Sequence, residues 1–527
     1  MPPRVQSTAV REPCLMRRVL ARLFLLVIFT APSWAQSTLI QNVMIYDGTG
    51  RAPFAGQVRI TGDRIAEVGR RLKPKAGEAV KDGGGLALAP GFIDMHSHAD
   101  RGLLQDLNAE VVVRQGITTV LVGQDGDSNY PLANWLAALD KTPPAMNVAS
   151  MVGQATLRRQ IMHDDLYRPS TADELKQMKS ILKQELSAGA FGLSTGLEYA
   201  PAHFSTTAEV VELSKVAAEE DGFYISHVRD EGDGVFDAFR ELLTIGAEAH
   251  LPVEITHIKL GTTPVWHQAA TEMPKLFAEA KTRKIDLRAD VYPYTYWHST
   301  IRVIVLDRDY FNPEKVSKAI ADNGGADHIR VTRYDPDPAM AGKTLDQIAA
   351  AWKLTPVDAY MRIVRETTAA PDHPARDEEV IVTSMSEDDL RWFIAQPQIA
   401  FCTDGELHGS HPRGAGTFPR ILGRYVREEK VLNFQEAIRK MTSLPASYIG
   451  LNNRGRIAPE YVADLVLFDP ARVIDRSTIE EPEAPPDGIV GVMVSGKWVV
   501  DDGKVTGAHP GKVLRHSKPP SLGTLPK

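Results

Sequence analysis

Eight short apolar runs alternate with helical stretches between about residue 88 and residue 406 of this 527-residue chain. Most of the runs are separated by segments such as 171–189 and 208–221, whose apolar residues recur at helical spacing. Strands that alternate with helices are typical of βα units around a parallel sheet, and eight such units predict a TIM-type (β/α)8 barrel of the α/β class. The eight candidate strands lie at residues 88–98, 116–126, 146–154, 189–199, 222–230, 252–260, 285–294 and 398–406.

The two ends of the chain carry a different pattern. Short alternating strands at 39–48 and 56–69 have Gly and Asp at their turns, and a similar pattern returns at 463–470 and 491–505. A few strands from one end cannot bury both of their faces. We therefore expect one small β-sandwich built from both ends, with residues 37–88 and 453–515 flanking a barrel at 89–452, and a tail at 516–527.

A polar stretch near 305–380 interrupts the last repeats of the barrel. It predicts an insertion that either covers the mouth of the barrel or is an ordinary variable loop. We favour the loop, because long surface insertions cost little chain entropy.

The N-terminus reads as an export signal over residues 1–35. Arg17 and Arg18 precede the apolar run LFLLVIFTA, and Ser33 and Ala35 supply the small residues that signal peptidase needs. The run is shorter than the roughly 20 apolar residues that span a bilayer, so a retained membrane anchor is the weaker alternative. The sequence thus predicts a periplasmic or secreted protein that is free of the membrane after cleavage.

The net charge of the chain argues against a nucleic-acid partner. The formal net charge is −7, and no cluster of Lys and Arg forms a basic patch. We therefore expect no nucleic-acid partner.

The first strand ends in two histidines that are spaced by one residue. Side chains alternate along a strand, so His96 and His98 point the same way and can share one partner, most simply a metal ion. Candidate ligands also end strands four, five, six and eight. They are Glu198, His227, His257 and Asp404.

Each histidine taken alone has a plain structural explanation, because a single His is commonly half-buried in a core. The set is more specific, since reactive residues of a (β/α)8 barrel lie at the carboxyl ends of its strands. Together these residues predict a metal centre.

The sequence resembles the amidohydrolase superfamily. Within it, the sequence motifs are most similar to those of the D-aminoacylases, which are N-acyl-D-amino-acid deacylases. The resemblance covers nearly all of the chain after the signal. It rests on APGFIDMHSHAD, GITTVLVG, GLSTGLEYAP, YISHVRDEGDGV, VEITHIK, DVYPYT, HPRGAGTFPRILGRYVRE and AIRKMTSLPA.

This resemblance implies a barrel with one or two divalent metal ions, Zn²⁺ first among them. Many members have a metal-ligating cysteine after the second strand, where this chain has Asp125 in the stretch VGQDG. Two residues could supply the missing anionic ligand, Asp125 itself or Glu198. We favour Glu198, because related enzymes place a carboxylated lysine or a glutamate at the end of strand four. Asp125 could equally be a turn residue in a Gly-rich loop.

The implied reaction is amide hydrolysis by a metal-activated water. Zn²⁺ lowers the pKa of its bound water to about 7 and polarises the scissile carbonyl. Asp404 is the expected catalytic base. By resemblance, the free carboxylate of a small N-acyl amino acid or short peptide would be bound by Tyr199, Lys259, Tyr292, Arg302 and Arg413.

Other functions stay open. Barrel and metal fix the reaction class while the loops fix the substrate, so a dipeptidase or another amidase or cyclic amidase of the superfamily is the first alternative. A non-catalytic periplasmic binding protein is the second, although such a protein would be expected to lose its ligands. His408 and His411 could line the mouth or belong to a loop.

Overall fold

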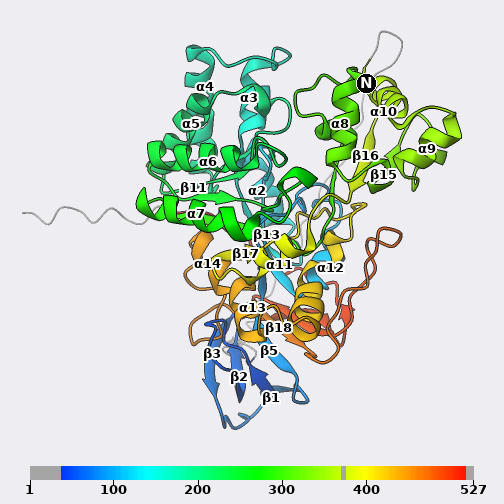
Figure 1. Ribbon diagram of the computed structural model, residues 1–527. Helices are drawn as coiled ribbons and strands as arrows, with labels where there is room; N and C mark the ends of the chain where they lie inside the picture. Colours follow the sequence, from blue (N-terminus) through cyan, green and yellow to red (C-terminus); the bar gives the residue numbers. More distant parts are fainter. Residues whose placement is uncertain (1–36, 370–374, 518–527) are drawn as a thin grey trace, which may run out of the picture. The chain divides into compact units, whose positions relative to one another are not determined.

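A closed barrel of parallel strands forms the centre of the protein (Figure 1). The computed structural model describes residues 37–369 and 375–517, so the predicted signal and the end of the predicted tail lie outside the described residues. The predicted fold class is confirmed. The barrel strands are β6 (Phe92–Asp94), β7 (Ile117–Val122), β8 (Asn147–Ser150) with β9 (Val152–Gly153), β10 (Gly192–Gly196), β11 (Phe223–His227), β12 (Val253–Ile255), β13 (Leu287–Val291) and β17 (Ile399–Phe401).

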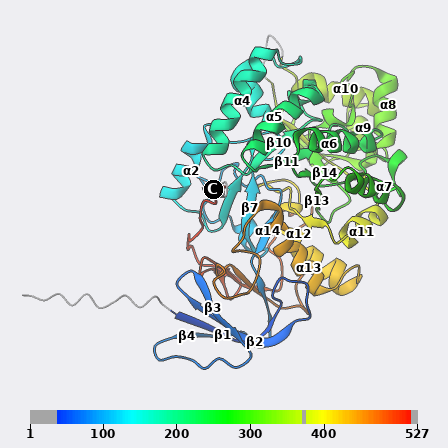
Figure 2. The ribbon, with the colours of Figure 1, turned by 90° about the vertical axis from the view of Figure 1, so that its left-hand side faces the viewer.

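Each barrel strand pairs in parallel with the next one along the chain. The ring closes where an isolated bridge joins Ser97, after β6, to Gly405, after β17. The helices that surround the barrel (Figure 2) are α1 (Glu110–Val113), α2 (Leu132–Lys141), α3 (Gln154–Met162), α4 (Ala172–Ser187), α5 (Thr207–Glu219), α6 (Val235–Ala249), α7 (Ala269–Thr282), α11 (Glu387–Ala395), α12 (Arg413–Arg420), α13 (Phe434–Met441) and α14 (Ser443–Ile449).

The first expected strand, 88–98, is divided in the structure. Its beginning, β5 (Ala87–Pro90), pairs with strands of the chain ends, and the barrel strand β6 starts only after Gly91. A Cβ at Gly91 would lie 2.1 Å from Oγ1 of Thr118, so only glycine fits where the chain passes from one sheet to the other.

Both ends of the chain build one nine-stranded sheet. Its two halves share an apolar core that includes Val58, Ile60, Leu465 and Met493, so residues from opposite ends of the sequence bury each other. The strands are β1 (Ser37–Ile45), β2 (Phe54–Thr61), β3 (Arg64–Gly69), β4 (Ala79–Asp82), β5, β18 (Leu465–Phe468), β19 (Ile489–Val494), β20 (Lys497–Asp501) and β21 (Lys504–Val505).

The insertion is a folded unit, which corrects the expectation of a variable loop. Three antiparallel strands and three helices enclose their own core of buried residues such as Val316, Val331 and Tyr360. Polar surface residues hid this core from the sequence reading. The elements are β14 (Trp297–Ser299), α8 (Pro313–Asp322), β15 (Ile329–Tyr334), α9 (Leu345–Trp352), α10 (Pro356–Thr367) and β16 (Glu378–Val382).

The last described residues run along the barrel. Leu514 donates its backbone N–H to the carbonyl of Val148 at 2.8 Å, and His516 donates to the carbonyl of Gly189 at 2.9 Å. Among the helices of the described residues, none has both the length and the apolar character that crossing a bilayer requires.

The core of the insertion can be tested with a matched pair of leucines. Leu345 is fully buried in that core, whereas Leu354 is 37% exposed. Leu345→Ala is expected to lower the free energy of unfolding by about 3 kcal/mol, through lost burial and the cavity it leaves. Urea denaturation measures the effect. Equal effects of Leu345→Ala and Leu354→Ala would contradict a packed insertion.

Candidate metal centre

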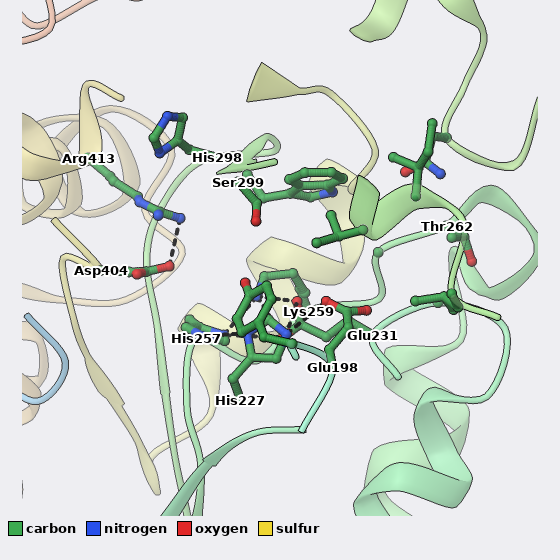
Figure 3. Close-up of a pocket in the computed structure, with 18 residues that line it drawn as sticks. Glu198, His227, Glu231, His257, Lys259, Thr262, His298, Ser299, Asp404 and Arg413 are labelled. Carbon is green, nitrogen blue, oxygen red and sulfur yellow. Dashed lines mark hydrogen bonds and ion pairs between the residues drawn. The ribbon is translucent and has the colours of Figure 1, made fainter. Parts of the chain in front are cut away.

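Polar side chains from separate strands meet at the carboxyl ends of the barrel. His96 and His98 follow β6, and Asp404 follows β17 at the closing seam, where its N–H donates to the carbonyl of His96 at 2.8 Å. Figure 3 shows part of this region from the cavity beside it. The other strands contribute Asp125 after β7, Glu198 after β10, His227 at the end of β11 and His257 after β12.

His96 and His98 face two carboxylates across a short gap. Their Nε2 atoms lie 3.2 Å apart. Nε2 of His98 lies 3.3 Å from Oδ2 of Asp125 and 3.3 Å from Oδ1 of Asp404, and Nε2 of His96 lies 3.6 and 3.4 Å from the same two oxygens. Imidazole nitrogens and carboxylate oxygens are the donors that Zn²⁺ takes in proteins.

Asp125 connects this group to a second one. Its other oxygen, Oδ1, lies 3.5 Å from Nε2 of His257, and that nitrogen lies 3.2 Å from Nδ1 of His227. One carboxylate therefore faces His96 and His98 with one oxygen and His257 with the other. Such an arrangement can hold one cation or bridge two.

The charges of the site fit a cation. Oδ1 of Asp125 is buried and accepts no hydrogen bond, although a buried carboxylate oxygen normally has a partner. Burial alone would lower the pKa of His98 and His257, yet neighbouring carboxylates outweigh it and raise these pKa values to about 9 and about 10. The buried negative charge thus calls for positive charge at this place, which a divalent metal ion supplies.

Three of the side chains stand on unusual backbone. Asp125, His257 and Asp404 have φ angles of 54°, 36° and 49°, in the left-handed region that non-glycine residues rarely adopt. Each lies two or three residues beyond the end of a barrel strand. Strain of this kind is concentrated at functional sites, where the surrounding fold imposes it.

Buried groups below the site orient the ligands. Nδ1 of His96 donates to Oγ1 of Thr256 at 2.6 Å, and that hydroxyl donates to Asp290 at 3.1 Å. Asp290 also accepts from the backbone N–H of His257 at 2.6 Å. Because Nδ1 of His96 carries the proton, the lone pair of its Nε2 is free to face the metal position.

The geometry reverses the order of the two candidate anionic ligands. Asp125 belongs to a four-residue group with His96, His257 and Asp404 whose donor atoms all lie within 4.8 Å of one another, and Glu198 does not. Oε2 of Glu198 instead accepts from Nε2 of His227 at 2.8 Å. Asp125, and not Glu198, therefore lies among these candidate donors.

Glu231 was missed by the sequence reading. Its Oε1 lies 3.2 Å from Nδ1 of His257, and both of its oxygens accept from Nζ of Lys259 at 2.8 Å (Figure 3). Glu231 follows His227 by four residues in the loop after β11, in the stretch HVRDEGDG. That spacing of a carboxylate beyond a strand-end histidine was the available signal.

Four of the five predicted substrate-binding residues surround the centre. Tyr199 packs on the ring of His227 at 4.4 Å between centroids. Arg413 donates to Oδ2 of Asp404 at 2.6 Å, and both Arg413 and Lys259 lie over the ring of Tyr292, at 4.9 and 5.7 Å from its centroid. Lys259, Tyr292 and Arg413 therefore form one cationic corner beside the metal position.

Arg302 lies apart from this corner, and it lines a neighbouring cavity with Glu198 and Tyr199. Its guanidinium donates to the buried carboxylate of Glu378 at 2.8 Å and to Oγ1 of Thr367 at 2.7 Å, inside the insertion. Of the two loop histidines, His411 is buried and its Nε2 donates to the carbonyl of Tyr296 at 3.0 Å, whereas His408 is exposed and pairs with Glu483.

The family model of the amidohydrolase family matches residues 79–500. The chain belongs to the amidohydrolase family. Among its relatives, D-aminoacylase of Alcaligenes xylosoxydans xylosoxydans is 33% identical, with 90% of this chain and 97% of the relative covered. N-acyl-D-glutamate deacylase of the same organism is 34% identical, with 90% and 96% covered. The crystal structure of N-acyl-D-glutamate deacylase from Bordetella bronchiseptica, complexed with zinc and a phosphonate inhibitor, superposes with a TM-score of 0.79 at 32% identity and covers 91% of this chain and 99% of its own.

The ligand assignment in this amidohydrolase can be tested by metal content. Asp125→Asn is expected to weaken zinc binding at least about tenfold, because it removes the charge that the histidines share. Glu198→Gln, the matched control, is expected to weaken it far less. Elemental analysis after dialysis against defined free zinc measures both. Loss of zinc from Glu198→Gln but not from Asp125→Asn would contradict the assignment.

The structural role of Arg302 is also testable. Arg302→Ala is expected to lower the free energy of unfolding by about 3 kcal/mol, because it leaves the buried Glu378 carboxylate without a cation and with only the backbone N–H of Ile301 as its donor. KM for substrate should not change. Arg330→Ala, which removes a pair with exposed Glu480 and an exposed hydrogen bond to the carbonyl of Gly342, is the control. A raised KM with an unchanged free energy of unfolding would indicate that Arg302 binds substrate and would contradict its structural role.

Proposed function

We propose that this amidohydrolase removes the acyl group from N-acyl-D-amino acids, releasing a carboxylate and a D-amino acid. The observation that carries the proposal is the juxtaposition of two elements at the barrel mouth. A cluster of histidines and carboxylates suited to zinc lies next to the cationic corner of Lys259, Tyr292 and Arg413. The first element activates water, and the second can bind the carboxylate that every amino-acid product carries.

The metal ligands in this proposal are His96, His98, Asp125, His227, His257 and Asp404. When bound there, zinc supplies a water with a pKa of about 7 and polarises the scissile carbonyl. The protein holds these donors in place through Thr256 and Asp290 below them. Glu231 fixes the ring of His257 from the other side.

Asp404 acts as the proton carrier. Burial would raise the pKa of its carboxyl, but Arg413 and the neighbouring histidines outweigh burial and hold that pKa well below its usual range. The group is therefore ionised at neutral pH. It can accept a proton from the attacking water and pass it to the leaving amine nitrogen.

The substrate is oriented by its charge. Lys259 and Arg413 flank the face of Tyr292, so a carboxylate placed beside that ring meets two cations. Tyr199 lines the same cavity as Lys259 and Arg413. These contacts would position the amide nitrogen of an N-acyl amino acid next to the metal position.

Two alternative functions account for different parts of the site. A dipeptidase or cyclic amidase of the same superfamily would use the same metal cluster with another arrangement of loops. A non-catalytic binding protein does not account for retention of every strand-end ligand. The N-terminal sequence supports export to the periplasm or out of the cell. The sequence has no cluster of Lys and Arg that would favour a nucleic-acid partner.

The stereochemistry of the substrate tests the function. Purified protein is expected to hydrolyse N-acetyl-D-amino acids much faster than their L-enantiomers. The carboxylate contacts and the metal position fix two of the groups on Cα, so the two enantiomers point their side chains at different walls of the site. Release of free amine from a panel of matched D and L pairs measures the preference. A preference for L-substrates would reject the proposal.

Asp404→Asn tests the proton carrier. The change should lower kcat by about a thousandfold, since general acid–base catalysis contributes factors of this order. Circular dichroism and the thermal midpoint are the controls for folding, and zinc content separates loss of the base from loss of the metal. A zinc-loaded Asp404→Asn protein with normal kcat would rule out the assigned role.

A further inference from the structure

Both cations of the cationic corner already have a carboxylate partner inside the protein. Arg413 donates to Oδ2 of Asp404 at 2.6 Å. Nζ of Lys259 donates to both oxygens of Glu231 at 2.8 Å (Figure 3). A substrate carboxylate that binds this corner therefore enters as a third anion beside two cations.

Lys259 and Glu231 form a buried pair. Their side chains are 3% and 13% exposed, and both line the cavity of Figure 3, which encloses about 50 Å³. In so small a space, a carboxylate that reaches Lys259 also comes close to Glu231. Like charges repel each other more strongly where water is excluded, so Glu231 opposes the binding of an anion here.

Orientation of the metal-binding histidine explains only part of this arrangement. Oε1 of Glu231 lies 3.2 Å from Nδ1 of His257, where a carboxylate can fix the imidazole ring. That contact needs one oxygen, yet both oxygens accept from Lys259. Glu231 therefore either holds Lys259 ready for the substrate or competes with the substrate for it.

The chemistry of the reaction favours competition. The α-carboxylate is the same in the N-acyl substrate and in the D-amino acid, so a contact to Lys259 holds both equally and does not lower the barrier. Two unpaired cations in a buried corner would retain the product and delay its release, a step that often limits kcat. An ammonium on a flexible stem can change partners, which suits Lys259 to such an exchange.

We propose that Glu231 competes with the α-carboxylate for Lys259 and thereby promotes release of the D-amino acid. The inference rests on the proposed function, which places that carboxylate at the cationic corner. On binding, Nζ of Lys259 transfers at least one hydrogen bond from Glu231 to the ligand, and on release Glu231 takes it back. Glu231 acts through Lys259, so it is a positioning residue and not a catalytic one.

Glu231→Gln tests the proposal, because it removes the charge and keeps an oxygen that can accept from Lys259. The inhibition constant of the product is expected to fall at least about threefold, since one anion fewer opposes binding, and KM of the N-acetyl substrate should fall with it. The product used is D-leucine, or D-glutamate if the enzyme releases that faster. Zinc is kept saturating and is checked by elemental analysis. An unchanged or higher inhibition constant would overturn the proposal, because loss of a residue that only orients Lys259 weakens binding.

Two controls show whether the effect is specific to the charge of this pair. The α-amide of the same D-amino acid lacks the carboxylate, and its inhibition constant should not fall in Glu231→Gln. Glu241→Gln is the matched variant, because Glu241 is also 13% exposed and also pairs at 2.8 Å, but with Arg229 and outside this cavity. Product affinity should not change in it. A fall of equal size with the α-amide, or in Glu241→Gln, would overturn the proposal.

A crystal structure of the wild-type protein with the product tests the same exchange if Glu231→Gln does not fold. The α-carboxylate should accept a hydrogen bond from Nζ of Lys259, and at least one oxygen of Glu231 should lie beyond hydrogen-bond reach of that nitrogen. A bound product with Lys259 still donating to both oxygens of Glu231 would overturn the proposal.

The outcome also separates this inference from the proposed function. Hydrolysis of N-acyl-D-amino acids by the wild type, with product affinity unchanged in Glu231→Gln, refutes the competition alone. Failure of the wild type to hydrolyse any N-acyl-D-amino acid refutes the proposed function, and with it the carboxylate on which this inference depends.

Discussion

Closure of the barrel is the constraint on which the site depends. The hydrogen bonds from Asp404 to His96 and from His98 to Gly405 join the first strand to the last, so residues about 300 positions apart become neighbours. In a parallel barrel every strand ends on the same rim. Each strand end therefore places one or two nitrogen or oxygen donors at the same position on the rim. No single segment of the chain contains the site.

The concentration of charge at that rim explains much of the surrounding structure. Asp125 and Asp404 are carboxylates in a buried setting, and each faces imidazole nitrogens. Buried charges are tolerated only when they are compensated. Arg413 provides part of the compensation for Asp404, and the unpartnered Oδ1 of Asp125 marks where compensation is missing. A divalent cation balances the remainder, which links the stability of the site to its chemistry.

The sequence allowed the barrel, the paired chain ends and most of the strand-end residues that meet at this rim to be predicted, because periodicity and the HxH spacing are local signals. It did not allow the ranking of Asp125 over Glu198, since that depends on which loop turns toward the barrel axis. The partner of Arg302 was not predicted for a related reason. The insertion has a core of its own, and Glu378, which pairs with Arg302, is far away in sequence. Glu231 acts through His257 and Lys259, contacts that only the folded chain reveals.

The most direct test is an anomalous diffraction experiment at the zinc edge on crystals of active protein. The account predicts an anomalous peak at the barrel mouth, with Nε2 of His96 and His98 at about 2.0–2.1 Å from the metal and oxygens of Asp125 and Asp404 next to it. Crystals of active protein with no peak there, or with zinc bound only elsewhere, would contradict the account.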